Sequence, residues 1–148
     1  MQIRRERDAA LVNRIANLPE VKPWLSRHGD DRPLDFSNII HGVVFLSNGE
    51  DAVIAFEQAT DREWECATMF APSCRGRRAL DTALEMKAWM LPHADMIFGS
   101  IPDNREFARA RWFYSAMGGE RVGAVTLADG RTAHAQPNEV LFACRDLH

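Results

Sequence analysis

The stretch Met69–Met90, MFAPSCRGRRALDTALEMKAWM, decides the fold that this sequence predicts. It ends an alternating strand pattern, turns through a basic segment and continues as a helix. A helix N-terminus exposes backbone N–H groups and carries a partial positive charge, and both attract phosphate. Because Arg75, Arg77 and Arg78 lie at this junction, the stretch predicts a site for a phosphorylated cofactor. The alternative is that these arginines only solvate the surface.

The composition is typical of a soluble globular protein, and we expect one domain over residues 1–148. The formal net charge of -3 argues against general nucleic-acid binding, which needs a basic excess. Cys66, Cys74 and Cys144 are odd in number and lack C-x-x-C pairing, which favours reduced thiols in the cytoplasm over disulfides or a structural zinc. A signal-peptide or membrane-spanning pattern is missing from the sequence, so we expect no membrane contact.

The N-terminal half combines helical spacing with strand alternation. The expected elements are a helix over residues 7–17, a short helix or irregular cap within 20–28, and strands over 42–46, 51–58 and 63–70. Ser47-Asn48-Gly49 is a strong hairpin turn between the first two strands. The three strands therefore predict an antiparallel meander, while residues 34–40 are too short and mixed to assign.

The C-terminal half begins with a short apolar strand over residues 95–101, which implies a parallel crossover from the strand before the basic turn. Residues 103–106 have the spacing of a capping box that opens a helix ending at Gly118-Gly119. Residues 120–127 and 131–144 then predict a last hairpin whose second strand is interrupted near Pro137.

This order of elements, the segment Phe70–Ala79 and the helix with Ala110, Tyr114 and Gly118 resemble the GNAT superfamily of N-acetyltransferases. The resemblance implies an α/β fold with a mixed, mostly antiparallel sheet and helices on both faces. It also implies acetyl-CoA as the co-substrate and direct acetyl transfer to an amine acceptor. A metal is not implied, and His28, His41, His93, His134 and His148 are scattered without ligand spacing.

The resemblance also assigns site residues. The implied backbone contacts to pantetheine come from Met69, Phe70 and Ala71, and the implied pyrophosphate loop consists of Arg75, Gly76, Arg77, Arg78 and Ala79. Asn104 is an implied contact to the cofactor arm, with helix capping as the alternative.

Acetyl transfer to an amine needs a base and an acid. Tyr114 lies at the family's acid position, and the alternative is a ring that only packs on the core face of its helix. Glu65 is the candidate base, Glu57 a weaker one, and a solvated surface glutamate is the alternative. Cys74 lacks a histidine partner in the sequence pattern, which disfavours a nucleophilic role.

The basic loop also departs from the family pattern, because Arg78 and Leu80 occupy two places where small residues are usual. Small residues let backbone N–H groups approach phosphates closely. Arg78 would either obstruct this approach or replace a backbone contact with a guanidinium–phosphate contact.

Three segments, NRIANLPEVKPW near the start, MFAPSCRGRRA and IPDN, are similar to acetyltransferase-like proteins of tailed phages. This narrower resemblance implies a second class of function, a virion or ejection protein that kept the fold without the activity. The implied partners are then virion proteins or further copies of the chain, in the host cytoplasm or the virion.

Overall fold

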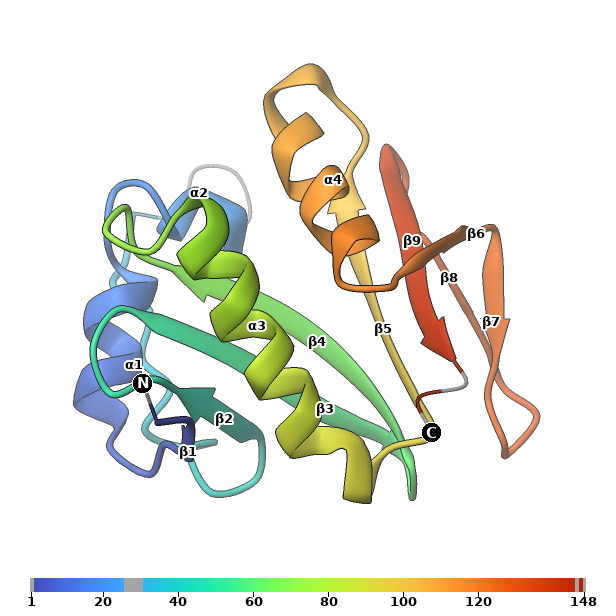
Figure 1. Ribbon diagram of the computed structural model, residues 1–148, viewed down its shortest axis with the longest axis horizontal. Helices are drawn as coiled ribbons and strands as arrows, with labels where there is room; N and C mark the ends of the chain where they lie inside the picture. The colour runs from blue at the N-terminus through green and yellow to red at the C-terminus, as the bar shows by residue number, and fades with distance from the viewer. Residues whose placement is uncertain (1, 26–30, 146, 148) are drawn as a thin grey trace. The chain divides into compact units, whose positions relative to one another are not determined.

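The structure is a computed structural model that describes residues 2–25, 31–145 and 147 (Figure 1). In the N-terminal half the elements are β1 (Arg4–Arg5), α1 (Ala9–Ala16), α2 (Lys22–Leu25), β2 (Val44–Ser47), β3 (Ala52–Thr60) and β4 (Glu63–Phe70). They continue with α3 (Gly76–Met90), β5 (Met96–Pro102), α4 (Ala108–Ala116), β6 (Glu120–Val122), β7 (Ala124–Thr126), β8 (Thr132–His134) and β9 (Glu139–Arg145). Two 3-10 turns, η1 (Leu91–His93) and η2 (Arg105–Phe107), precede β5 and α4. Residues 26–28 of the predicted segment 20–28 lie outside the described residues.

The main sheet has the strand order β1-β2-β3-β4-β5-β9-β6. Strands β4 and β5 pair in parallel, with Glu65 opposite Phe98. The pairs β1–β2, β2–β3, β5–β9 and β6–β9 are antiparallel. The predicted parallel crossover and the predicted mixed, mostly antiparallel sheet are therefore confirmed.

The chain divides into two compact units, the first of residues 1–56 and 67–86 and the second of residues 57–66 and 87–148. Strands β3 and β4 each contribute residues to both units. The expected single domain over residues 1–148 stays a prediction.

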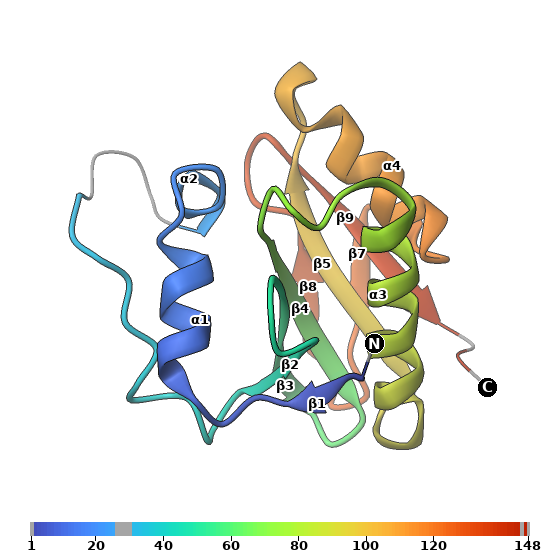
Figure 2. The same cartoon turned by 60° about the vertical axis from the view of Figure 1, so that its left-hand side comes forward.

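In the first unit, α1 forms because its apolar side recurs at helical spacing and its first turn is capped. The Asp8 carboxylate accepts a hydrogen bond of 2.9 Å from the Ala10 N–H. The buried Val12 and Ile15 of this helix pack in one cluster with Phe45 and Met69 of the strands. Figure 2 shows α1 and α3 on opposite sides of β2 and β3, so this part of the sheet is covered on both faces.

In the second unit, β5 and β9 bury both faces because alternate side chains point in opposite directions. On one face Phe98 and Leu141 pack with Val125 and Leu127 of the β7–β8 hairpin segment. The other face carries Ile101, Val140 and Phe142, which pack against Phe107, Ala110 and Tyr114. Ala110 and Tyr114, about one turn apart on α4, therefore lie on the face of the helix that packs against β5 and β9.

The predicted final hairpin is confirmed between β7 and β8, with the predicted interruption near Pro137, but the outer segments do not continue it. The segment 120–127 breaks at Gly123 into β6 and β7, and the segment 131–144 breaks before Glu139 into β8 and β9. Strand β6 pairs with β9 in the main sheet, whereas β7 and β8 form a separate two-stranded sheet. The second break includes Asn138, which has a positive φ of 66°.

The predicted capping box is also wrong. Residues 105–107 form a 3-10 turn before α4 begins, and within the described residues neither element has a side-chain cap at its start. The carbonyls of Pro102 and Asn104 instead accept hydrogen bonds of 2.8 and 2.6 Å from Arg111. The Asp103 carboxylate lies 3.7 Å from Arg121. The backbone carbonyls and the Asp103 carboxylate of this segment therefore contact arginines farther along the chain.

Candidate functional site

The basic loop of the first unit ends in an open helix N-terminus. The loop turns where the Cys74 N–H donates to the Ala71 carbonyl at 2.9 Å, and α3 begins at Gly76. Gly76 has a φ of 61°, and an added Cβ there would meet nothing within 4 Å. Since the first N–H groups of a helix have no intrahelical carbonyl to bind, the start of α3 offers donors to an anion.

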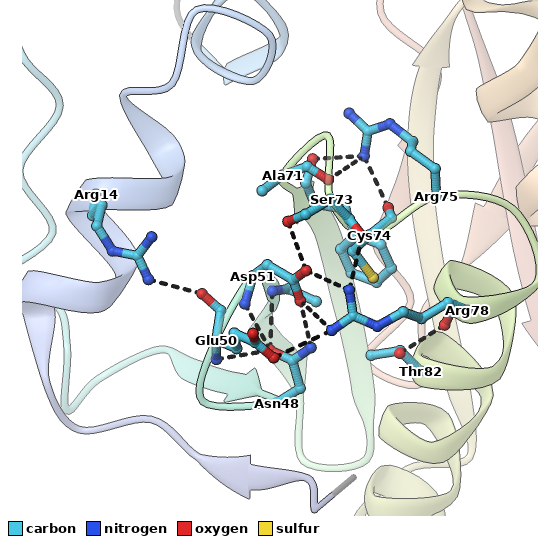
Figure 3. Close-up of polar contacts among 12 residues, drawn as sticks. Arg14, Asn48, Glu50, Asp51, Ala71, Ser73, Cys74, Arg75, Arg78 and Thr82 are labelled. Atoms are coloured by element: carbon cyan, nitrogen blue, oxygen red, sulfur yellow. Dashed lines mark hydrogen bonds and ion pairs between the residues drawn. The ribbon is translucent and has the colours of Figure 1, made fainter.

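Arg75 is exposed and stabilises the loop through hydrogen bonds to its carbonyls (Figure 3). Its Nη1 donates to the carbonyls of Phe70, Ala71 and Cys74 at 2.8, 2.8 and 3.1 Å. Carbonyl groups in a turn would otherwise point their negative ends at an approaching anion. The arginine neutralises them and adds a positive charge to the loop.

Arg78 forms a two-pronged ion pair with Asp51. Its Nη1 lies 2.6 Å from Oδ2 and its Nη2 lies 3.1 Å from Oδ1. The Asp51 side chain is only 7% exposed. Its burial opposes ionisation, but hydrogen bonds from Asn48, Ser73 and Arg78 outweigh that effect and hold the pKa of the carboxyl below its usual value.

Arg77 is highly exposed, with 86% of its side chain accessible, against 39% for Arg78. It pairs with Asp81 one turn along α3, at 3.0 Å. A surface pair of this kind contributes little to stability. Arg77 can therefore exchange Asp81 for another anion.

The three residues predicted to contact pantetheine have buried side chains, Met69 at 1%, Phe70 at 7% and Ala71 at 6% exposure. Their backbone groups are partly engaged, because the Ala71 N–H donates to the Asp51 carbonyl at 2.9 Å and two of the carbonyls accept from Arg75. Ala79 is also buried, and its N–H donates to the Arg75 carbonyl at 3.4 Å. Their cofactor contacts stay a prediction.

Tyr114, in the second unit, fits a slot at Gly99. Its Oη lies 3.8 Å from the Cys66 sulfur, and its ring centroid lies 6.0 Å from that of Phe142. A Cβ added at Gly99 would lie 3.3 Å from Tyr114 Cε1 and 2.9 Å from the Cys66 carbonyl oxygen. The missing side chain of Gly99 therefore lets the tyrosine ring approach β5, and its role as an acid stays a prediction.

Cys66 stays protonated beside this tyrosine. Burial of its thiol raises the pKa to about 12, although hydrogen bonding to Tyr114 acts in the opposite direction. A neutral thiol is a poor nucleophile but a suitable weak hydrogen-bonding neighbour for a phenol. Cys74 is fully buried in the first unit, where burial also raises its pKa.

Glu65 has an electrostatic environment that suits a base. The residue is exposed overall, but partial desolvation of its carboxyl and the negative charges of Glu57 and Glu139 raise its pKa above the ordinary value. Glu139 was not a candidate from the sequence, because it reaches this region only through β9. It also lines a shallow groove of about 470 Å³ formed by residues 121–123, 135 and 139–141.

Asn104 is exposed, and its backbone is extended at the start of η2. Its carbonyl accepts from Arg111, so the structure places Asn104 beside an arginine without testing a cofactor contact. The described residues contain no His/Cys/Asp/Glu group that could hold a metal ion, and His28 and His148 lie outside them. Over the same residues, helices of sufficient length and apolarity to cross a bilayer are absent.

Comparison with known proteins shows which solved structures have a similar fold. No protein-family model and no curated protein sequence matches this chain. The aminoglycoside acetyltransferase AAC(6')-Ib, solved with coenzyme A and kanamycin, matches with a TM-score of 0.63 at 16% identity, over 95% of this chain and 92% of its own. A protein from Desulfovibrio desulfuricans described as a GNAT acetyltransferase matches with a TM-score of 0.63 at 15% identity, over 97% of this chain and 98% of its own.

A variant of the spermidine N-acetyltransferase SpeG from Vibrio cholerae matches at a TM-score of 0.63 and 13% identity, over 97% of this chain and 92% of its own. At these identities the likeness shows the fold. The chain has the fold of GNAT acetyltransferases, as the sequence predicted.

The slot at Gly99 predicts a specific loss of stability. Gly99→Ala should lower the free energy of unfolding by about 1–3 kcal/mol, because the new methyl group overlaps the Cys66 carbonyl and crowds the Tyr114 ring. Gly123→Ala is the matched control, since its Cβ would meet nothing within 4 Å, and it should change stability by less than about 0.5 kcal/mol. Urea denaturation measures the free energy of unfolding of both variants. Equal values would contradict the close packing of Tyr114 at Gly99.

Proposed function

We propose that the protein is an acetyl-CoA-dependent N-acetyltransferase that transfers the acetyl group directly to an amine. The observation that carries this proposal is the open N-terminus of α3 at Gly76, set behind a loop that Arg75 holds together. The GNAT fold supports it, and proteins with the same fold were solved with coenzyme A and with the amine-bearing kanamycin. We place the reaction in the cytoplasm.

The residues of the loop fit a pyrophosphate. The first N–H groups of α3 at Gly76, Arg77 and Arg78 are donors without intrahelical partners, and open space at Gly76 admits an anion. Arg75 and Arg77 add positive charge. The segment Arg75–Ala79 is thus the proposed pyrophosphate loop, while Met69–Ala71 and Asn104 remain proposed contacts to the rest of the cofactor.

Glu65 and Tyr114 are the proposed proton-transfer groups. Acetyl-CoA provides an activated thioester, and its carbonyl carbon is the centre that the amine attacks. Glu65 accepts a proton from the substrate ammonium, which frees the lone pair that forms the new C–N bond. The Tyr114 hydroxyl donates its proton to the departing sulfur as the C–S bond breaks, and the phenolate regains a proton from the nitrogen, which becomes the amide. The acceptor itself is an amine of unassigned identity.

A second candidate is a phage virion or ejection protein that keeps the fold without activity. One observation favours it: Arg75 and Arg78 already donate to acceptors of the chain itself, as arginines in a purely structural loop would. This candidate predicts the protein in purified virions by mass spectrometry, together with an absence of acetyl-CoA binding.

Titration calorimetry with acetyl-CoA tests the proposed function. The protein should release binding heat at high micromolar concentration. Arg75→Ala should weaken binding about ten- to hundredfold, because it removes a charge and three hydrogen bonds that stabilise the loop. Arg7→Ala, the same change at an exposed residue before α1, is the control and should leave the affinity unchanged. Absence of heat with the wild-type protein would refute the proposal.

Tyr114→Phe should separate chemistry from binding. Removing the hydroxyl takes away the proposed acid but keeps the ring in its slot at Gly99. We expect kcat to fall by about 100-fold, within the usual range for a general acid, with nearly unchanged acetyl-CoA affinity. Steady-state kinetics over a panel of amines measures the first quantity and calorimetry the second. Equal turnover would exclude Tyr114 from the mechanism.

The raised pKa of Glu65 predicts the pH dependence. A base acts as the carboxylate, so kcat/KM should fall as the pH drops through the raised pKa of Glu65. Glu57→Gln removes a negative charge that helps to raise this pKa, so the acidic limb should move to lower pH. Glu85→Gln, the same change at an exposed site on α3, should leave the limb in place. An acidic limb that stays in place in Glu57→Gln would contradict the assignment of Glu65 as the base.

A further inference from the structure

We propose that Asp51 is a positioning residue for the pyrophosphate loop, fixing its shape through Ser73 and Arg78. The inference rests on the proposed function, since it concerns how the same loop is held for a phosphate. It assigns Arg78 to the architecture of the loop, a role that the sequence did not suggest.

Asp51 is itself held in place by the turn between β2 and β3. The Asn48 Oδ1 accepts hydrogen bonds from the N–H groups of Glu50, Asp51 and Ala52 at 3.0, 2.9 and 3.1 Å. The Asn48 Nδ2 donates to Asp51 Oδ1 at 2.7 Å. The side chain is 7% exposed, so its carboxylate has a defined place in the unit before any ligand arrives.

From this place Asp51 contacts the loop at three separate points (Figure 3). Its backbone carbonyl accepts from the Ala71 N–H at 2.9 Å, at the end of β4. Its Oδ2 accepts from the Ser73 hydroxyl at 2.7 Å, in the middle of the loop. The same carboxylate binds Arg78, in the first turn of α3. One residue therefore fixes the start, the middle and the end of the segment that presents the helix N-terminus.

Arg78 completes this arrangement. Its Nη1 also donates to the Ser73 carbonyl at 2.8 Å, which closes the loop onto the helix. A two-pronged pair with a mostly buried carboxylate is a strong, directional interaction, and breaking it would leave the Asp51 charge without compensation. Arg78 thus acts on a phosphate through the geometry of the loop, and the backbone N–H groups and the other arginines make the direct contacts.

The charge of Asp51 distinguishes two explanations, because they predict opposite changes in the affinity for an anion when Asp51 is neutralised. If Asp51 merely neutralised Arg78, then Asp51→Asn would free a positive charge and strengthen the binding of an anion. If Asp51 positions the loop, the same substitution weakens binding although it makes the loop more positive.

The experiment is a double-mutant cycle on the full chain, with coenzyme A as the probe in titration calorimetry. We expect Asp51→Asn and Arg78→Met each to weaken binding by about tenfold, and the double variant to lose no more than either single variant. Ser73→Ala, which leaves all charges intact, should weaken binding by a smaller factor. Glu50→Gln is the matched control, because Glu50 is an exposed partner of Arg78 at 3.3 Å, and it should bind as the wild type does.

In the affinity measurements, three results would overturn the inference: tighter binding by Asp51→Asn, wild-type affinity in Asp51→Asn, or losses that add in the double variant. Additive losses would mean that Arg78 contacts the phosphate independently of Asp51. Pantetheine, which lacks the phosphates, supplies a further readout. The affinity for pantetheine should not change among these variants. If it fell in parallel with the affinity for coenzyme A, the cause would be general unfolding, and the inference would not hold.

Amide hydrogen exchange without ligand separates this inference from the proposed function. The amides of residues 73–79 should exchange faster in Asp51→Asn than in the wild type or in Glu50→Gln, while those of α1 should not change. If the wild-type protein gives no heat with coenzyme A, the proposed function fails, and faster exchange would still support the positioning role. Unchanged exchange at residues 73–79 would refute the positioning role.

Discussion

The carboxylate of Asp51 is the contact on which the basic loop depends. A loop with consecutive turns cannot satisfy its own backbone groups, and a helix start leaves several N–H groups without carbonyl partners. Asp51 supplies acceptors to Ala71, Ser73 and Arg78, while Arg75 supplies donors to three carbonyls of the same segment. These two residues allow a short loop to hold one shape and to keep the N-terminus of α3 open.

The second unit uses a different constraint, the close approach of backbone and side chain at Gly99. Since glycine has no Cβ, the ring of Tyr114 lies against β5 and its hydroxyl lies near a thiol that stays protonated. Glu65 stands on β4, the strand that pairs in parallel with β5. Its raised pKa comes from partial desolvation and from two glutamates on other strands, Glu57 and Glu139. The sheet pairing thus brings together groups that are distant in the sequence.

The structure gives a physical reason why the basic loop can carry Arg78 where a small residue is usual. Arg78 occupies a place where a small residue is usual, yet its guanidinium is directed to Asp51 and Ser73. A bulky residue at this place is compatible with an open helix start, because the side chain is held away by its ion pair. The small residue that the geometry does require is Gly76, whose φ of 61° favours glycine.

Most helices and strands and the class of fold could be predicted from the sequence, because periodicity, turn residues and helix signals are local. The strand ending at Phe70, the helix after Gly76 and the parallel crossover to β5 were all predicted. Local spacing failed at residues 103–106, where the Asp103 carboxylate lies near Arg121 and Arg111 binds the backbone carbonyls of Pro102 and Asn104.

Tertiary structure alone decided the contacts that shape the candidate site. Asp51 meets Arg78 across 27 residues and Cys66 meets Tyr114 across 48, so neither pair leaves a pattern in a local window. The pairing of the last strands was decided in the same way, since β9 could join β6 or β8 by local propensity, and burial of Leu141 and Phe142 selects the main sheet. Propensity acts over a few residues, whereas burial and ion pairing depend on which segments the folded chain brings together.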